Sequence, residues 1–461
     1  MYTIDFQNPI HVHFIGIGGI SMSGLADILL DRGFQVSGSD RSESELTKWL
    51  EASGARIFYG QRAENIEEGT DLVVYTAAIH PDNPEYAAAV KANIPMLTRA
   101  ELLGQLMKNY QMPIAIAGTH GKTTTTSMAS HILLAANLDP TISVGGILPA
   151  IHGNIRVGND KIFLTEACEY TNSFLDFFPK ISIILNIDAD HLDFFKDLDD
   201  IRHSFRLFAE KLPNEGILII NHAIPNVEEI TKDLTCRVVF YGTGDSSKAD
   251  YYAADITYDE QACGSFTLIK GSKNLGRFTL HVPGSHNVDN AVAALAMADI
   301  LEIPVEQMQK GLASFGGTER RFQHKGEISG VTIIDDYAHH PTEIKATLTA
   351  AQNCAHNTIW CVFQPHTYTR TKALLDDFAK ALSLSDKVVL ADIYAARETD
   401  TLGISSETLQ KKIRELGKDA YYFPSFDEIE NFLLENCVKG DLIITMGAGD
   451  VVKIGEHLLG K

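Results

Sequence analysis

The chain has 461 residues, of which 45% are hydrophobic and 21% are charged, and this composition excludes a disordered, collagen-like or low-complexity protein. Its 39 basic and 60 acidic residues give a formal net charge of −21. Because an acidic chain repels a phosphate backbone, we expect no broad binding of nucleic acid. The length predicts about three domains of roughly 100–200 residues each.

The cysteines and the N-terminal segment indicate a cellular compartment. The six cysteines are scattered and form no C-x-x-C pair, so neither a disulfide framework nor a zinc knuckle is expected. Residues 1–14 lack a basic start and a long apolar stretch, which indicates no secretory signal. The sequence also shows no run of about 20 apolar residues that would span a membrane. We therefore predict a cytoplasmic protein with no membrane partner.

Short β-rich runs alternate with helical stretches along the chain. Continuous apolar runs are typical of strands covered on both faces, and hence of parallel sheets. Their alternation with helices predicts an α/β fold. The predicted strands are 11–17, 71–77, 113–118, 161–167, 181–187, 331–336, 358–364, 387–393 and 441–447. The stretch 245–280 instead alternates polar and apolar residues between turns, which indicates antiparallel strands.

Glycine-rich turns and a junction segment divide the chain. We predict a Rossmann-like N-terminal domain at 1–109 and a central domain similar to P-loop ATPases at 110–318. The antiparallel stretch would form a small accessory sheet of the central domain. A second Rossmann-like domain is predicted at 319–461.

The strongest local signal is the segment GTHGKTT at 118–124, between a predicted strand and a predicted helix. Backbone N–H groups of such a loop, together with the helix N-terminus, surround phosphate oxygens. Lys122 would supply a cation for the β- and γ-phosphates, and the Thr123 hydroxyl suits Mg²⁺. Ile116 stands where the usual motif has its first glycine, so the loop is a shortened variant. A chance glycine-rich turn is the alternative, but the position at a strand–helix junction disfavours it.

A second glycine-rich segment opens the chain. Gly16, Gly18 and Gly19 follow the first predicted strand, and Asp40 ends the second. The spacing favours a dinucleotide fingerprint with its ribose-binding acid about 20 residues further on, although Ser21 stands where the third glycine belongs. A dinucleotide, another nucleotide diphosphate and tight packing alone remain open interpretations.

Two polar residues follow buried strands of the central domain. Glu166 closes the strand 161–167, and His191 comes soon after the strand 181–187. Ligands gather at the carboxyl ends of parallel strands, so the two residues could hold Mg²⁺ beside a triphosphate. Mg²⁺ prefers oxygen ligands, which makes Glu166 the better candidate. Surface polar residues that cap strand ends are the alternative.

The last block carries three polar clusters, at 317–322, 335–341 and 364–371. Two of them directly follow predicted strands, where a substrate would be held. Arg321 and Arg370 could each pair with a carboxylate or a phosphate. Solvated loops are the alternative interpretation.

Together these segments resemble the Mur ligase family, in particular its alanine-adding branch. The resemblance spans about residues 11–450 and rests on the glycine-rich start and on 118–124, 166–175, 188–193, 316–322, 335–344 and 364–371. It implies a step of peptidoglycan precursor synthesis. ATP would phosphorylate the lactyl carboxylate of UDP-N-acetylmuramate, and the amino group of L-alanine would attack the acyl phosphate. The three domains would bind the UDP-sugar, ATP and the amino acid in that order.

The resemblance also implies residue roles. Catalysis is assigned to Lys122, Glu166, His191 and Arg321, and metal binding to Thr123, Glu166 and His191. ATP would be bound by Gly118, Thr119, His120, Gly121, Lys122, Thr123, Thr124, His286 and Asn287. The UDP-sugar would be bound by Gly16, Gly18, Gly19, Ser21 and Asp40, and the amino acid by Tyr337, His339, His366 and Arg370. The expected cofactors are ATP and Mg²⁺.

Two departures from the family pattern are visible. Several sister ligases carry a carbamylated lysine near the metals, whereas the segment 201–208 has no lysine, as in the alanine-adding branch. Some members have arginine where this chain has Thr367, which leaves Arg370 as the partner for the alanine carboxylate.

Three other functions compete with the ligase. An NAD-dependent oxidoreductase would use the first glycine segment, but a dehydrogenase has no use for a γ-phosphate loop. A nucleotide-regulated binding module would not need the Glu166 and His191 pair. Within the family, a ligase that adds a preformed peptide to the same UDP-sugar is the closest rival.

Overall fold

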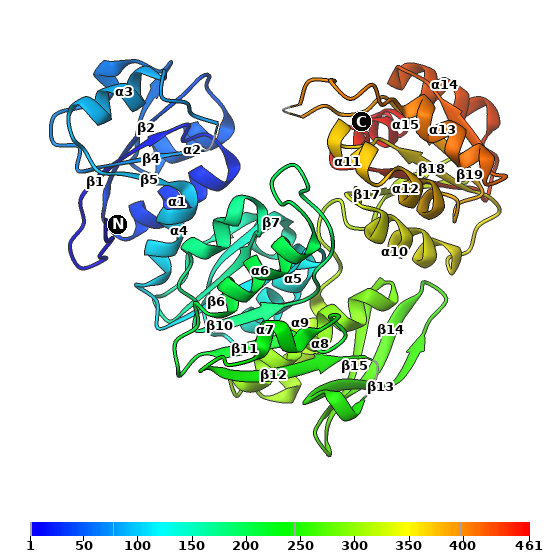
Figure 1. Ribbon diagram of the computed structural model, residues 1–461, viewed down its shortest axis with the longest axis horizontal. Helices are drawn as coiled ribbons and strands as arrows, with labels where there is room; N and C mark the ends of the chain where they lie inside the picture. Colours follow the sequence, from blue (N-terminus) through cyan, green and yellow to red (C-terminus); the bar gives the residue numbers. More distant parts are fainter. Residues whose placement is uncertain (1, 77, 244–245, 397) are drawn as a thin grey trace.

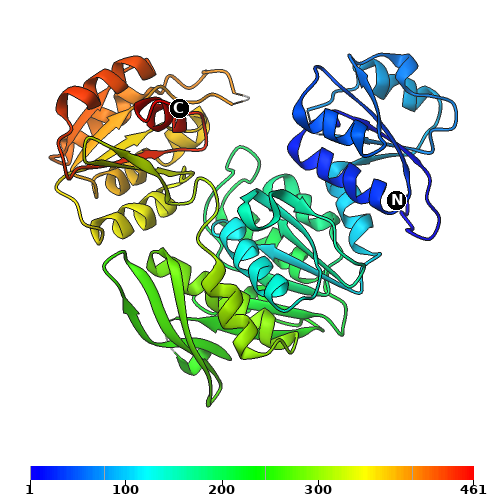
Figure 2. The ribbon, with the colours of Figure 1, turned by 180° about the vertical axis from the view of Figure 1, so that it is seen from behind.

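The computed structural model describes residues 2–76, 78–243, 246–396 and 398–461. They form three lobes, with the middle lobe between the N-terminal and C-terminal ones (Figures 1 and 2). Each predicted strand coincides with an observed one, so the expected α/β class is confirmed. Residues 77 and 245, at the edges of two predicted stretches, lie outside the described residues. Within those residues, no helix has the length and apolar character needed to cross a membrane.

The N-terminal lobe is a parallel five-stranded sheet in the order β3-β2-β1-β4-β5. Its central strand β1 is buried along its whole length, which explains the continuous apolar run. Thr98 and Glu101 form a capping box that starts the last helix of the lobe. The elements are β1 (His11–Ile15), α1 (Ile20–Asp31), β2 (Gln35–Asp40), α2 (Glu45–Ala52), β3 (Arg56–Tyr59), β4 (Leu72–Tyr75), α3 (Pro84–Lys91), β5 (Met96–Thr98) and α4 (Arg99–Met107).

The middle lobe contains a ten-stranded sheet in the order β15-β14-β13-β12-β11-β10-β6-β9-β7-β8. Its strands are β6 (Met112–Ala117), β7 (Thr141–Leu148), β8 (Gly153–Arg156), β9 (Ile162–Ala167), β10 (Ile181–Ile184), β11 (Ile217–Asn221), β12 (Arg237–Gly242), β13 (Tyr251–Tyr258), β14 (Cys263–Lys270) and β15 (Lys273–Pro283). Its helices are α5 (Lys122–Ala135), α6 (Leu198–Ala209), α7 (Val227–Thr231), α8 (Ser285–Ile300) and α9 (Val305–Ser314), with a 3₁₀ segment η3 at Tyr170–Asp176.

The predicted antiparallel strands are present as β13, β14 and β15. They are not detached from the main sheet, because β13 pairs with β12 at Tyr241 with Tyr251 and at Gly242 with Tyr252. The accessory sheet is therefore a continuation of the central one.

The C-terminal lobe has a six-stranded sheet in the order β16-β17-β21-β18-β19-β20. Only the edge strand β16 pairs antiparallel with its neighbour among the described strands of this sheet. The elements are β16 (Gln323–Ile328), β17 (Val331–Asp336), α10 (Pro341–Gln352), β18 (Ile359–Phe363), α11 (Tyr368–Ala373), α12 (Leu375–Leu382), β19 (Lys387–Leu390), α13 (Ser406–Glu415), β20 (Asp419–Tyr422), α14 (Phe426–Asn436), β21 (Leu442–Met446) and α15 (Val452–Leu458).

The N-terminal and middle lobes share one apolar core. A single cluster joins Val12, Leu29 and Leu106 of the first lobe to Phe163 and Phe205 of the second. The apolar clusters of the C-terminal lobe contain residues of that lobe alone. Because apolar burial resists separation, the shared core holds the first two lobes together, and no such core joins the C-terminal lobe to them among the described residues.

Two glycines explain why the first two lobes approach so closely. A Cβ added to Gly24 of α1 would overlap Ile155 of β8, and one added to Gly104 of α4 would overlap the backbone of Asp176. Glycine is required at both positions because the partner backbone or side chain occupies the space.

Candidate active site

The phosphate loop connects β6 to α5 in the way the sequence predicts. Gly118 has φ +146° and Gly121 has φ +84°. A Cβ at Gly121 would lie 2.7 Å from Oδ1 of Asn290, and one at Gly118 would lie 2.9 Å from Cβ of Leu185. Both glycines are therefore required by backbone conformation and by space. The loop places the N-terminus of α5, which attracts anions, at the edge of the interlobe space.

The Lys122 ammonium group points back into its own loop. Nζ donates to the carbonyl of Gly118 at 2.5 Å, to the carbonyl of Thr119 at 3.2 Å and to Oε2 of Glu169 at 2.9 Å. Burial alone would lower the pKa of Lys122, but the nearby Glu169 raises it above its ordinary value. The side chain is therefore a fixed positive charge beside the loop.

Thr123 and Glu166 are in direct contact. The Thr123 hydroxyl donates to Oε2 of Glu166 at 3.1 Å, and the N–H of Gly145 donates to Oε1 at 2.5 Å. Burial raises the pKa of the Glu166 carboxyl. A hydroxyl and a carboxylate in contact are the oxygen ligands that Mg²⁺ prefers, so these two residues fit the predicted cation.

His191 lies in the same cavity without touching Glu166. It has φ +53° in the loop between β10 and α6, and its ring stacks on Tyr170 at 4.5 Å between centroids. Nε2 lies 3.8 Å from Oε1 of Glu169. The cavity, of about 470 Å³, is also lined by Lys122, Thr123, Glu166, Arg321, Tyr337 and His339, so residues of the two lobes face each other across it.

Among the described residues, the group that approaches metal-site geometry is a different one, formed by His120, Asp188 and His340. Both ring nitrogens of His340 already have partners, the carbonyl of Ala189 and the N–H of Thr342. Burial alone would lower the pKa of His120, but hydrogen bonds with Asp188 and Glu343 raise it to about 9. His120 of the middle lobe also pairs with Glu343 of the C-terminal lobe at 3.3 Å, so this group is an ion-pair network between the lobes.

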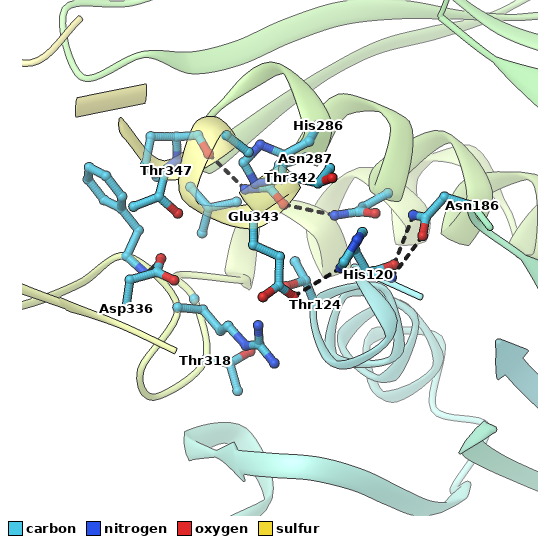
Figure 3. Close-up of a pocket in the computed structure, with 18 of the residues that line it drawn as sticks. His120, Thr124, Asn186, His286, Asn287, Thr318, Asp336, Thr342, Glu343 and Thr347 are labelled. Carbon is cyan, nitrogen blue, oxygen red and sulfur yellow. Dashed lines mark hydrogen bonds and ion pairs between the residues drawn. The ribbon is translucent and has the colours of Figure 1, made fainter. Parts of the chain in front are cut away.

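A second cavity, of about 200 Å³, is also lined by residues of the loop, His120 and Gly121 (Figure 3). His286 and Asn287, at the start of α8, line it together with Thr124 and Asn186. Burial lowers the pKa of His286 to about 4, so its imidazole is neutral. Asn186 holds the loop in place, since its Oδ1 accepts from the N–H of His120 at 2.8 Å.

The N-terminal glycine loop uses Asp40 internally. Oδ2 of Asp40 accepts from the N–H of Gly18 at 2.8 Å. Gly16 has φ +85°, Gly19 is the N-cap of α1, and Ser21 is exposed in the first turn of this helix. The predicted residues thus form one loop, and the hydrogen bond to Asp40 holds its backbone in place.

The predicted C-terminal residues form a continuous row of rings. Tyr337 and His339 lie 5.5 Å apart, and His339 and His366 lie 5.8 Å apart, between centroids. His366 in turn stacks on Tyr394 at 5.5 Å. Burial lowers the pKa of His339 and of His366 to about 4 in each case. The row therefore presents neutral, partly apolar surfaces.

Arg370 is already paired. Its Nε donates to Oδ1 of Asp190 at 2.9 Å, and its NH1 lies 3.1 Å from Nδ1 of His366. Burial alone would raise the pKa of Asp190, but the guanidinium holds it well below its usual range. Asp190 belongs to the middle lobe, so this buried pair joins the two lobes.

The two arginines at the lobe junction differ in their partners. Arg320 donates to Asp335 at 2.9 Å and to the carbonyls of Gly449 at 3.0 Å and Gly447 at 2.7 Å, so it holds strands of its own lobe together. Both guanidinium groups lie over the ring of Tyr337, Arg320 at 5.0 Å and Arg321 at 5.2 Å, but only Arg321 lines both cavities. Of the two, Arg321 is the one available to a ligand.

Comparison with known proteins agrees with this arrangement. Three family models match the chain: the Mur ligase catalytic domain at 11–111, the Mur ligase middle domain at 116–298 and the Mur ligase glutamate ligase domain at 320–449. The chain belongs to the Mur ligase family.

Individual Mur ligases are similar over their full length. The UDP-N-acetylmuramate–L-alanine ligase of Agathobacter rectalis is 63% identical over 461 residues, which cover 100% of both chains. The ligase of the same name from Clostridium botulinum is 52% identical and covers 97% of this chain and 96% of its own.

Solved structures of Mur ligases share the fold. The UDP-N-acetylmuramate–alanine ligase of Thermotoga maritima has a TM-score of 0.79 and 31% identity, with 98% of each chain covered. A murein peptide ligase of Psychrobacter arcticus has a TM-score of 0.70 and 25% identity, also with 98% of each chain covered. The three-domain α/β arrangement expected from the sequence is thus confirmed.

The structure of this Mur ligase adds acidic residues that the sequence alone did not select. Glu169 pairs with Lys122, Glu343 pairs with His120 at 3.3 Å, and Asp190 pairs with Arg370. Glu169 and Asp190 lie inside motifs recognised in the sequence, but motif membership does not tell which oxygen meets which cation. Their position after strands of the parallel sheet was the available signal.

The interlobe network predicts a pH dependence for this Mur ligase. His120 faces Asp188, Glu343 and His340, and its pKa is raised from 6.5 to about 9. A raised pKa means that the contact is fully present below about pH 6.5 and is lost as the pH rises through about 9. We expect the distance between the two lobes to increase as the pH rises through about 9, as followed by energy transfer between dyes on the two lobes. His120→Gln, which cannot titrate, should show no such transition, and an identical transition in this variant would contradict the assignment.

Proposed function

We propose that this protein is an ATP-dependent ligase that joins L-alanine to the lactyl carboxylate of UDP-N-acetylmuramate and releases ADP and phosphate, in the synthesis of peptidoglycan precursors. One observation carries the proposal. Lys122, Glu166 and His191 of the middle lobe face Arg321, Tyr337 and His339 of the C-terminal lobe across a single cavity. A phosphate site and an amino-acid site on opposite walls suit a reaction that passes through an acyl phosphate.

The chain's own residues support the first half of this reaction. An oxygen of the lactyl carboxylate attacks the γ-phosphorus of ATP, and the bond from that phosphorus to ADP breaks. Because an anion approaches another anion, catalysis consists mainly of positioning and charge neutralisation. Lys122 and Arg321 supply the positive charges. Mg²⁺, held by Thr123 and Glu166 with His191 nearby, would neutralise phosphate charge when bound.

The second half forms the amide. The amino nitrogen of L-alanine attacks the acyl carbon, the carbon–oxygen bond to phosphate breaks, and the amine loses a proton. Tyr337, His339 and His366 would form the wall around the alanine side chain, and Arg370 would pair with its carboxylate. The C-terminal lobe, whose contacts with the middle lobe are polar, would close over the acyl phosphate and keep water out.

The remaining assignments follow the same division. We propose that residues 1–109 bind the UDP-sugar, 110–318 bind ATP and 319–461 bind the amino acid. His286 and Asn287 would lie beside the adenine in the smaller cavity, where a neutral imidazole and an amide suit a neutral base. Because its substrates are a nucleotide sugar and ATP, we place the reaction in the cytoplasm.

The deciding experiment compares acceptors. Purified protein is given ATP, Mg²⁺ and UDP-N-acetylmuramate with either L-alanine or a tripeptide, and the release of ADP is measured. We expect ADP release with L-alanine, weaker release with glycine, since one methyl group gives only about 10–200-fold discrimination, and none with D-glutamate. Preference for the tripeptide would instead assign the protein to the peptide-adding ligases, and ADP release without any acceptor would contradict ligation.

The N-terminal loop provides a second test. A Cβ at Gly18 would lie 2.8 Å from Oδ2 of Asp40 and 2.9 Å from Cγ2 of Thr47, so Gly18→Val must displace the loop that Asp40 braces. The clash therefore lies within the protein and needs no bound ligand. We expect calorimetry to show UDP-sugar binding weakened at least tenfold, by roughly 1.4 kcal/mol or more, with ATP binding unchanged.

A matched variant separates loop distortion from contact with the ligand. A Cβ at Gly19 would lie 3.5 Å from the nearest other atom, the carbonyl oxygen of Gly16, so Gly19→Ala leaves the loop in place. Weaker UDP-sugar binding by this variant would report a diphosphate close to the backbone. Tighter NAD binding than UDP-sugar binding by the unmodified protein would overturn the assignment.

A further inference from the structure

Glu169 is buried at the centre of the phosphate site, yet no motif assigns it a role. It follows β9 and begins the segment η3, and only 1% of its surface is exposed. Oε2 accepts from Lys122 Nζ at 2.9 Å. Oε1 has no hydrogen-bond partner among the described residues, and Nε2 of the His191 ring lies 3.8 Å from it.

The contacts of Lys122 explain why Glu169 matters. An ammonium group has three protons, and here they point at Gly118, Thr119 and Glu169. To reach a nucleotide phosphate, Lys122 must give up at least one of these contacts. The contact with the Glu169 carboxylate is the one between charged groups, so it opposes phosphate binding most strongly.

Release of Lys122 has a consequence for Glu169. A buried carboxylate that loses its paired cation strongly destabilises the folded protein. Another cation must therefore approach Glu169 when Lys122 turns to a phosphate. The reaction supplies such a cation, namely the divalent cation that would bind at Thr123 and Glu166 together with the nucleotide.

We propose that Glu169 is a positioning residue whose carboxylate pairs with Lys122 when no phosphate is bound. When a nucleotide and a divalent cation bind together, Lys122 moves to the phosphate and the cation takes its place beside Glu169. Glu169 thereby couples nucleotide binding to cation binding. This inference rests on the proposed function, because it assumes that a nucleotide phosphate approaches Lys122. It predicts that nucleotide binds weakly without the cation and that Glu169 is the reason.

The test measures ADP binding by calorimetry, once with EDTA and once with Mg²⁺, for the full-length protein and for Glu169→Gln. The amide keeps the shape but not the charge, so Lys122 is released. We expect ADP without metal to bind more tightly to the variant, and the gain in affinity from Mg²⁺ to shrink by about tenfold, within the range of about 5–150-fold that is usual for coupling between two ligands.

Glu210→Gln is the matched control. Its carboxylate accepts from Nε of Arg206 at 2.7 Å, in the same lobe and outside both cavities. The control variant should keep both its affinity for metal-free ADP and the full Mg²⁺ effect. Tighter metal-free binding by both variants would mean that general negative charge, and not the Lys122 contact, is responsible, and it would overturn the inference.

A second variant tests the inference if Glu169→Gln fails to fold. Glu169→Asp keeps the charge but is too short to hold Lys122, so its affinity for metal-free ADP should lie between those of the unmodified protein and the glutamine variant. Unchanged or weaker metal-free binding in both Glu169 variants would overturn the inference. Failure of the unmodified protein to bind ADP under any condition would instead overturn the proposed function.

Discussion

Lys122→Ala is expected to reduce the rate of ligation by about 10²–10³-fold, the usual cost of removing one group that stabilises charge in a transition state. The residue lies at the start of α5, and its ammonium group is held beside the phosphate loop. The measurement is ADP release with saturating UDP-N-acetylmuramate and L-alanine. Near-normal turnover in the variant would contradict the proposed contact between Lys122 and the phosphates of ATP.

A loss of activity could also come from misfolding, and the structure shows how to separate the two causes. Lys122→Ala leaves the buried Glu169 without its cation, which by itself should cost about 3–5 kcal/mol of stability. The double variant Lys122→Met with Glu169→Gln removes both charges together and should recover most of this stability in thermal unfolding. It should remain inactive, because no cation faces the phosphates. Recovery of activity along with stability would show that Lys122 is only structural.

Lys196→Ala is the control for lysine removal as such. This side chain is 87% exposed and lies in the middle lobe outside both cavities. We expect its activity and its unfolding temperature to match those of the unmodified protein.

The sequence was sufficient for the fold because the buried strands are continuous apolar runs. The strand β10, for example, is buried along its whole length, and the two glycine-rich turns mark where α1 and α5 begin. The joining of β13 to β12 was not predictable, because only two residue pairs make that connection. A pairing this short leaves no periodic pattern in the sequence.

The sequence predicted which residues lie in the candidate site, but not which of them pair with one another. Thr123 and Glu166 are 43 residues apart in sequence and in contact in the structure, and a parallel sheet explains why they meet. The pairing of Arg370 with Asp190, across 180 residues, depends on the placement of one lobe against another. No local pattern encodes it, because both residues are also plausible partners for a ligand.

The pairing of Arg370 leads to the last prediction, which concerns recognition of the amino acid. Nε of Arg370 is committed to Asp190 and NH1 lies beside His366, so the planar fork is held in a fixed orientation, and its remaining N–H groups are the donors for a carboxylate. Lysine has a point charge without this fork. We expect Arg370→Lys to raise the KM for L-alanine about 10–100-fold, the equivalent of one hydrogen bond to a charged group, and to change the KM for ATP little.

Two further variants decide whether the effect belongs to this contact. Arg414→Lys makes the same replacement in the same lobe, where the arginine only donates to the carbonyl of Ala420 at 2.9 Å, and it should leave the KM for L-alanine unchanged. Asp190→Asn should raise that KM by misplacing Arg370. Because both residues act through one contact, the double variant of Asp190 and Arg370 should be little worse than Arg370→Lys alone. Fully additive effects would mean that Asp190 acts separately, and an unchanged KM in Arg370→Lys would move the carboxylate site to Arg321.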